Sequence, residues 1–152
     1  MADSTRELIF KNIKSILEAI TVANGYNNDF TSETIQRWQQ RGNTTRVVPC
    51  IIINAGPEEY QPAPSPYYTA KLTVYLDVWQ RQQEGDTVPT DTLLNALLAD
   101  VIKAILVDET RGGNAVDTDI VSCVPFETVE GQPMCGIIVE LEIMYQFIPS
   151  NL

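Results

Sequence analysis

A chain of 152 residues with 44% hydrophobic and 20% charged side chains is long enough to fold as one domain, residues 1–152, without disulfides or metal. It contains no histidine, which excludes the usual Ser-His-Asp and Cys-His mechanisms and the histidine-containing zinc sites. A formal net charge of −10 argues against a protein that binds the phosphate backbone of nucleic acid. These features favour a binding or structural protein over an enzyme, and we expect no cofactor.

The chain begins with a predicted amphipathic helix that extends from about Ser4 to Val22. A serine and a glutamate three residues later have the spacing of a capping box. Apolar side chains recur behind them at helical spacing (Ile9, Ile13, Ile16, Leu17 and Ile20). Few aliphatic residues follow up to Arg46, and within this polar stretch we expect a short helical turn over Asp29–Gln40.

Two strands with a loop between them are predicted next. Val47–Ile53 is a continuous apolar run of the right length for a buried strand. Ala55–Pro66 contains four prolines, so we expect a stiff, extended loop that takes no part in a sheet. Tyr67–Trp79 alternates strictly between apolar and more polar residues and is the clearest strand of the chain, with one apolar face (Leu72, Val74, Leu76 and Val78).

A second helix and a hairpin complete the predicted elements. Thr90–Asp108 has a wide apolar face, and Ile120–Phe126 and Cys135–Phe147 form a hairpin around the turn Glu130–Pro133. The order is helix, two strands, helix, two strands. We therefore expect one α+β domain with a mainly antiparallel four-stranded sheet, two main helices packed on one face, and the two longest strands at its centre.

The charge is distributed unevenly along the chain. Up to Arg46 there are six basic and five acidic residues, whereas from Val47 onward four basic residues face fifteen acidic ones. This acidic excess is typical of a channel wall past which DNA moves without specific binding. It would equally serve only to keep the protein soluble. No apolar run approaches the roughly 20 residues that span a bilayer, and the first residues do not resemble a signal peptide. We expect a protein made in the cytosol that does not enter a membrane.

The three cysteines, Cys50, Cys123 and Cys135, are odd in number and form no CxxC pair. Each lies in an apolar stretch. We therefore expect buried, free thiols in a reducing compartment.

Four stretches carry a family resemblance: Pro49–Glu59, the strand Tyr68–Trp79, the helix Thr90–Asp108, and Glu130–Pro133 leading into the last strand. Together with the opening helix they resemble the bacteriophage tail terminator family, also called tail completion or minor tail protein U-like proteins. The resemblance lies in the pattern of elements and in local phrases, and it includes no catalytic motif.

The resemblance implies a structural virion protein that forms a hexameric ring on the end of the tail tube. The ring would stop tube growth, bind the tail tube protein on one side and present the attachment surface for a neck or head-completion protein on the other. DNA would pass through without specific binding. The protein would be made in the host cytoplasm and end in the tail or neck of the virion. No catalytic residue is implied.

Candidate site residues follow from charge and from aromatic side chains in polar surroundings. Tyr75 and Trp79 lie on the more polar face of their strand, where an aromatic side chain marks either a partner surface or ordinary packing. Arginines near the basic start of the chain are expected to meet an acidic neighbour. The interface candidates are Arg37, Trp38, Arg41, Arg46, Tyr75 and Trp79.

Glu140 and Glu142 share one strand face, about 7 Å apart by strand geometry, and are the candidates for the lumen of the ring. Two alternatives stay open. A different neck protein, such as a head-completion or stopper component, shares this size and acidity. A hydrolase could use the two glutamates as acid and base, and it would need a cleft around them. The pairs Glu58-Glu59 and Asp117-Asp119 lack the spacing of a calcium loop, so no metal site is expected.

Overall fold

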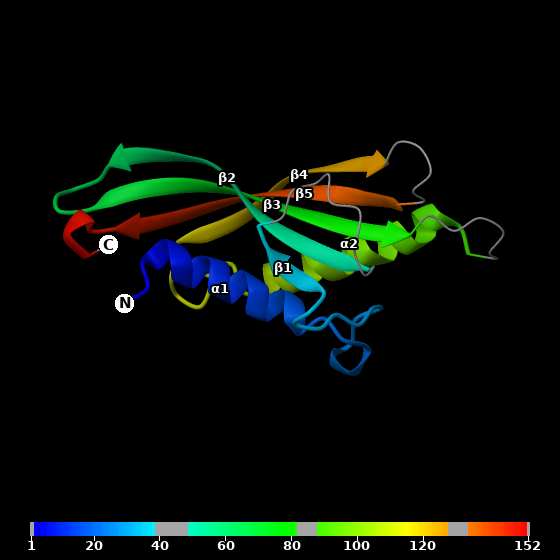
Figure 1. The fold of residues 1–152 in the computed structure, drawn as a ribbon. Helices are drawn as coiled ribbons and strands as arrows, with labels where there is room; N and C mark the ends of the chain where they lie inside the picture. The colour runs from blue at the N-terminus through cyan, green and yellow to red at the C-terminus, as the bar shows by residue number, and fades with distance from the viewer. Residues whose placement is uncertain (1, 39–48, 82–87, 128–133, 152) are drawn as a thin grey trace.

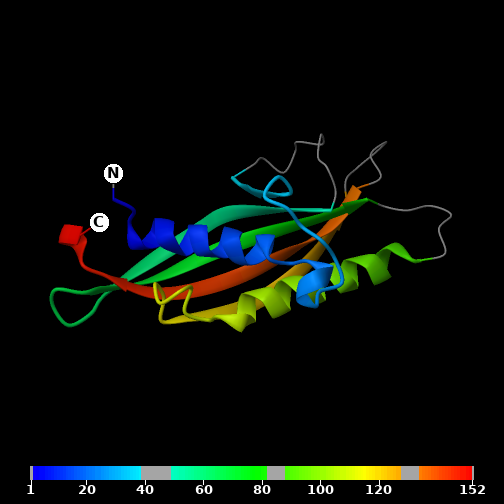
Figure 2. The ribbon, with the colours of Figure 1, turned by 90° about the horizontal axis from the view of Figure 1, so that it is seen from below.

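The computed structural model describes residues 2–38, 49–81, 88–127 and 134–151. A five-stranded sheet lies over two helices, and both helices are on the same side of it (Figures 1 and 2). In chain order the elements are α1 (Thr5–Glu18), η1 (Val22–Asn24), β1 (Ile35–Arg37), β2 (Cys50–Pro62), β3 (Tyr68–Arg81), α2 (Thr90–Val107), β4 (Asp117–Glu127), β5 (Met134–Phe147) and η2 (Pro149–Asn151).

The strand order across the sheet is β1-β2-β3-β5-β4. The pairs β2–β3, β3–β5 and β5–β4 are antiparallel, and β1 is parallel to β2. The predicted central position of β3 and β5 is confirmed. The predicted four-stranded, mainly antiparallel sheet is wrong, because β1 adds a fifth strand and makes the sheet mixed. The α+β class is compatible with what the structure contains.

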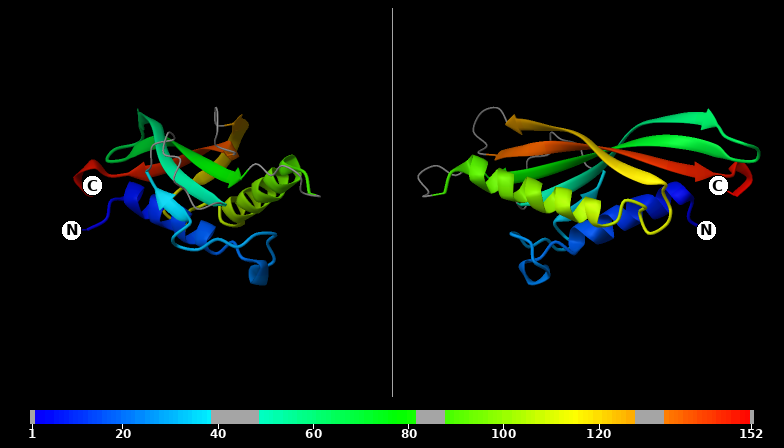
Figure 3. Two further views of the ribbon diagram at one scale, coloured as in Figure 1. Left: turned by 45° about the vertical axis from the view of Figure 1, so that its right-hand side comes forward. Right: turned by 180° about the vertical axis from the view of Figure 1, so that it is seen from behind.

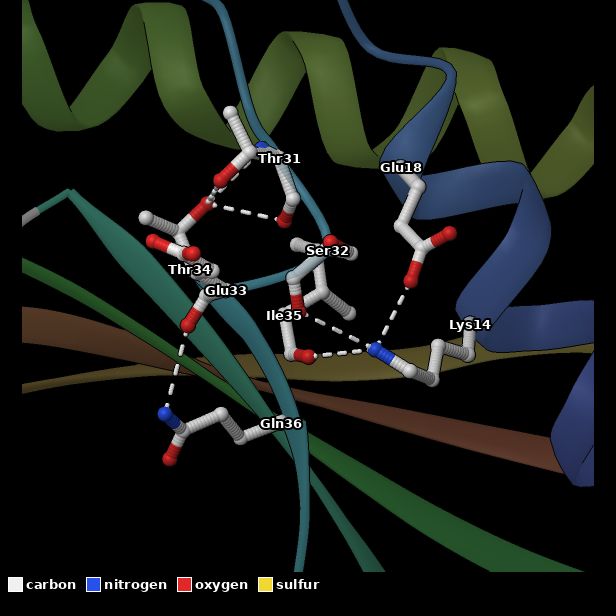
Figure 4. Close-up of polar contacts among 8 residues, drawn as sticks. All are labelled: Lys14, Glu18, Thr31, Ser32, Glu33, Thr34, Ile35 and Gln36. Carbon is white, nitrogen blue, oxygen red and sulfur yellow. Dashed lines mark hydrogen bonds and ion pairs between the residues drawn. The ribbon is translucent and has the colours of Figure 1, made fainter.

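The missed strand β1 lies where a short helical turn was predicted. It has only three residues, of which Ile35 alone is buried, so it has no alternating pattern to distinguish it from a helical turn. Contacts from α1 hold the segment leading into it. The Lys14 ammonium donates to the carbonyl oxygens of Ser32 (3.2 Å) and Ile35 (2.7 Å) and pairs with Glu18 at 2.7 Å (Figure 4).

The proline-rich stretch Ala55–Pro66 is also different from the prediction, because β2 continues through it to Pro62. Pro57 lies where the register with β3 shifts, between Ala55 and Glu58. At such a bulge a residue leaves the ladder, so the missing amide proton of proline is tolerated. β1 pairs only with Ile51–Ile53, so the rest of β2 lies at the edge of the described sheet.

The helix termini follow the local sequence. In α1 the Ser4 hydroxyl accepts a hydrogen bond from the Glu7 amide (3.2 Å), as in one half of a capping box. The helix ends at Glu18 and not at Val22, because Thr21 begins the separate turn η1, which closes on Gly25 in the left-handed region at φ 90°.

One continuous core of buried side chains joins the sheet to the two helices, which lie on the same side of the sheet (Figure 3). Leu72, Val74 and Leu76 of β3 are fully buried in it, together with alternate residues of β5 and the apolar faces of α1 and α2. A second, smaller cluster contains Cys50, Ile52, Trp79 and Met134. Side chains alternate along a strand, so Ile52 and Trp79 point to the opposite face from their neighbours Ile51 and Val78 of the main core.

Candidate functional site

The sheet face opposite the helices carries a row of acidic residues, and we call it the open face. Glu140 lies opposite Tyr75 of β3 and Ser122 of β4, and Glu142 lies opposite Asp119. The one residue between them on β5, Leu141, is fully buried in the core, so both glutamates point to the open face. The two lumen candidates are therefore on one surface, with a third carboxylate beside them.

A shallow hollow of about 330 Å³ lies on the open face and is lined by Tyr75, Ser122, Val124, Ile138 and Glu140. Glu142 is not part of this lining. The Ser122 hydroxyl lies 3.5 Å from a Glu140 carboxylate oxygen. A hydrolase that uses both glutamates needs a cleft on which they converge. This hollow contains one of them, so its geometry does not favour the hydrolase.

The two aromatic interface candidates of β3 have different environments. Tyr75 is half-buried and lines the hollow on the open face. Trp79 is 2% exposed and packs edge-on against Phe126, with ring centroids 4.6 Å apart. The expectation that Trp79 forms a partner surface is therefore corrected: its ring fills the second apolar cluster, which a strand pattern alone cannot distinguish from an interface.

Arg37 and Trp38 lie at the edge of the sheet opposite β4. Arg37 is the last residue of β1, and Trp38 follows it. The Arg37 guanidinium holds the Glu7 carboxylate at two points, 2.7 and 3.0 Å, and lies 5.3 Å from the Phe10 ring centre. These hydrogen bonds lower the pKa of the Glu7 carboxyl and raise the pKa of Arg37. Arg37 thus has a partner within its own chain, and its expected contact with a neighbour stays a prediction.

Trp38 is the most exposed of the aromatic candidates. Its side chain is 71% exposed and its backbone has φ 56°, the left-handed region that bulky residues rarely adopt. Its amide donates to the Ile53 carbonyl oxygen at 2.9 Å, which fixes the end of β1 against β2. Arg41 and Arg46, the other two interface candidates, lie outside the described residues.

Two buried polar groups that sequence reasoning missed fix the loops around the core. Asp100 of α2 is 2% exposed, and its carboxylate accepts five hydrogen bonds of 2.9–3.1 Å from the backbone and side-chain amides of Asn27 and Asn28. Arg111, fully buried after α2, donates to the Ile105 carbonyl at the helix end. A single charged residue, within a helix as for Asp100 or in a turn as for Arg111, gives no sequence signal that it is buried.

A third missed contact ties α1 to the sheet. Glu58 accepts from the Arg6 guanidinium at 3.0 Å and from the Tyr145 hydroxyl. Burial, and secondarily this hydrogen bond, raise the pKa of Tyr145 above its ordinary value. Because Glu58 was placed in a loop by the sequence analysis, its structural role between two strands and a helix was not foreseen.

The three thiols form no disulfide in the structure. Cys50 and Cys135 are buried as expected, but Cys123 is exposed on β4. This strand is the edge of the sheet, so its side chains gain less cover than an apolar sequence pattern suggests.

Residues 2–38, 49–81, 88–127 and 134–151 contain no group of three or more side chains placed to hold a metal ion. Neither α1 nor α2, nor any other helix in those ranges, has the length and apolar character needed to cross a membrane. Comparison with protein-family models and with curated proteins found no match for the chain.

Proposed function

We propose that this protein is a structural component of a tailed bacteriophage that forms a ring, with six copies as the expected number, on the end of the tail tube. The ring terminates tube growth and offers the attachment surface for the head and neck. The observation that carries the proposal is the open face, because its acidic row lies on a side of the sheet that neither α1 nor α2 covers.

The electrostatics of the open face suit a channel wall. Glu140, Glu142 and Asp119 lie side by side across β5 and β4, and the chain from residue 112 to its end contains six acidic and no basic residues. Such a surface repels the phosphate backbone, so DNA passes without being held by counterion release. With the helices directed outward, a ring of these sheets would present its carboxylates to the lumen.

The proposal is tested by tube length. The purified protein is added to polymerising tail tube protein from the same phage, and tube lengths are measured by negative-stain electron microscopy. We expect shorter tubes that carry a ring at one end, with no further growth after fresh tube protein is added. Unchanged lengths and bare tube ends would contradict the terminator role.

A different neck component is the alternative within the same class, since its size and acidity would be similar. It predicts binding to the head-side neck proteins but no effect on tube length. Pull-down with each partner, run beside the tube assay, separates the two roles.

A further inference from the structure

Trp38 has the properties of an anchor for a partner. Its indole is 71% exposed, and the left-handed φ of 56° costs about 1–2 kcal/mol for a residue with a side chain. Exposed strain of this kind is found where a residue acts on something outside its own fold. Tryptophan is also among the residues that contribute most to binding when they enter a pocket of a partner.

A hollow of matching character lies at the far edge of the same molecule. It measures about 220 Å³ and lies between the first turn of α2 and the ends of β4 and β5. Leu94, Pro125, Phe126 and Cys135 give it an apolar lining, and Asp91 lies at its rim on an exposed position. The volume is below the roughly 300–1,000 Å³ of small-molecule sites and suits a single large side chain.

The two features are on opposite edges of the sheet, since β1 is outermost on one side and β4 on the other. When unlike surfaces on opposite edges contact each other, a growing row of copies keeps one free surface at each end. Further copies can therefore be added, and the row closes into a ring if the rotation between neighbouring copies allows it. Charge favours the same pairing. The chain up to residue 46 has one surplus positive charge, whereas residues 112–152 have six acidic residues and no basic one.

We infer that Trp38 of one copy inserts into this hollow of the next copy, and that this head-to-tail contact builds the ring. The occupant is thus a second copy of this chain, with the indole against Leu94 and Phe126 and its N–H directed to the rim that carries Asp91. The inference rests on the proposed ring and names the contact that holds it together.

The test uses one variant at each edge, Trp38→Ala and Pro125→Arg. Each should shift the monomer–assembly midpoint about 30-fold or more to higher concentration in analytical ultracentrifugation, since hot-spot truncations have effects of this size. Gln36→Ala, which changes an exposed residue of β1 two positions before Trp38, is the matched control and should assemble like the parent. Circular dichroism melting verifies that each variant is folded.

Mixing the two variants tests the geometry itself. Trp38→Ala keeps an intact hollow and Pro125→Arg keeps an intact Trp38, so their mixture should form dimers of one copy of each, and nothing larger. If the parent forms rings but Trp38→Ala does so equally well, or the mixture forms no mixed dimers, this contact is wrong while the proposed function stands. A parent that stays monomeric and leaves tube length unchanged contradicts the proposed function and the contact together.

Discussion

The two faces of the sheet are formed by the same strands but carry different side chains: one is part of the apolar core and the other presents acidic residues. On the helix-covered face, Leu72, Val74 and Leu76 of β3 are fully buried in a core that spans all the major elements. On the open face, the small cluster around Trp79 is followed by the row Glu140, Glu142 and Asp119. The covered face stabilises the fold through apolar burial, whereas Glu140 and Glu142 are half-buried, Asp119 is exposed, and all three lie outside that core.

The largest expected difference between the faces is in stability. Leu76→Asp places an unpaired charge in the core and should lower the free energy of unfolding by several kcal/mol, or prevent folding. Thr73→Asp introduces an aspartate on the open face instead, opposite Glu142, and should lower the free energy of unfolding by about 1 kcal/mol or less. Urea denaturation of both variants measures the contrast. An equal loss of unfolding free energy in both variants would contradict the assignment of the core to the helix-covered face.

A smaller effect is expected from the buried carboxylate that anchors a loop beneath the covered face. Asp100→Ala removes the acceptor of five hydrogen bonds from Asn27 and Asn28 and should cost about 3 kcal/mol. Asn95→Ala, at an exposed position of the same helix, is the control and should stay within about 0.5 kcal/mol of the parent. A parent-like melting curve for Asp100→Ala would show that this network does not stabilise the fold.

Alkaline pH should weaken the covered face through Tyr145. Its pKa is raised in the folded protein, so the neutral phenol is favoured there. The resulting stability is fully present below the unfolded pKa of about 10 and is lost as pH rises through the higher folded pKa. Denaturation at pH 8 and pH 11 should show a smaller loss for Tyr145→Phe than for the parent. An equal loss in both would assign the alkaline sensitivity to other groups.

The smallest effect on stability is expected on the open face, where the change should appear in DNA binding instead. Glu140→Lys combined with Glu142→Lys should alter the free energy of unfolding by about 1 kcal/mol or less. The double variant should gain binding to duplex DNA that weakens with salt, because it replaces two repulsive carboxylates with phosphate-binding groups. Fluorescence anisotropy at low salt measures this. Tight DNA binding by the parent would contradict the role of the open face.

Elements with strong periodicity were predictable, and those defined by tertiary contacts were not. The alternation in β3 gave the position of that strand closely, and the helical spacing gave the start of α1 but not its end, because one face of each is buried. β1 depends on pairing with β2 and on the Lys14 contacts, which leave no local pattern. The segment after Ala55 was predicted to be a loop because of its prolines. It continues the strand β2, which tolerates proline at a bulge and at its end.

The candidate site was predictable only in part, for a related reason. Strand alternation places Glu140 and Glu142 on one face from sequence alone. Whether an aromatic side chain on that face is exposed or buried depends on residues far away in the chain. Trp79 lies against Phe126, whereas Trp38, in a stretch expected to be helical, is the exposed tryptophan.

The orientation of the sheet in the assembled ring tests the central claim most directly. Cryo-electron microscopy of the protein on tail tubes, at a resolution that separates sheet from helices, measures which face borders the channel. The account predicts a closed ring in which Glu140 and Glu142 face the axis and α1 and α2 lie outside. A ring with its helices toward the channel, or tubes that end without this protein, would contradict it.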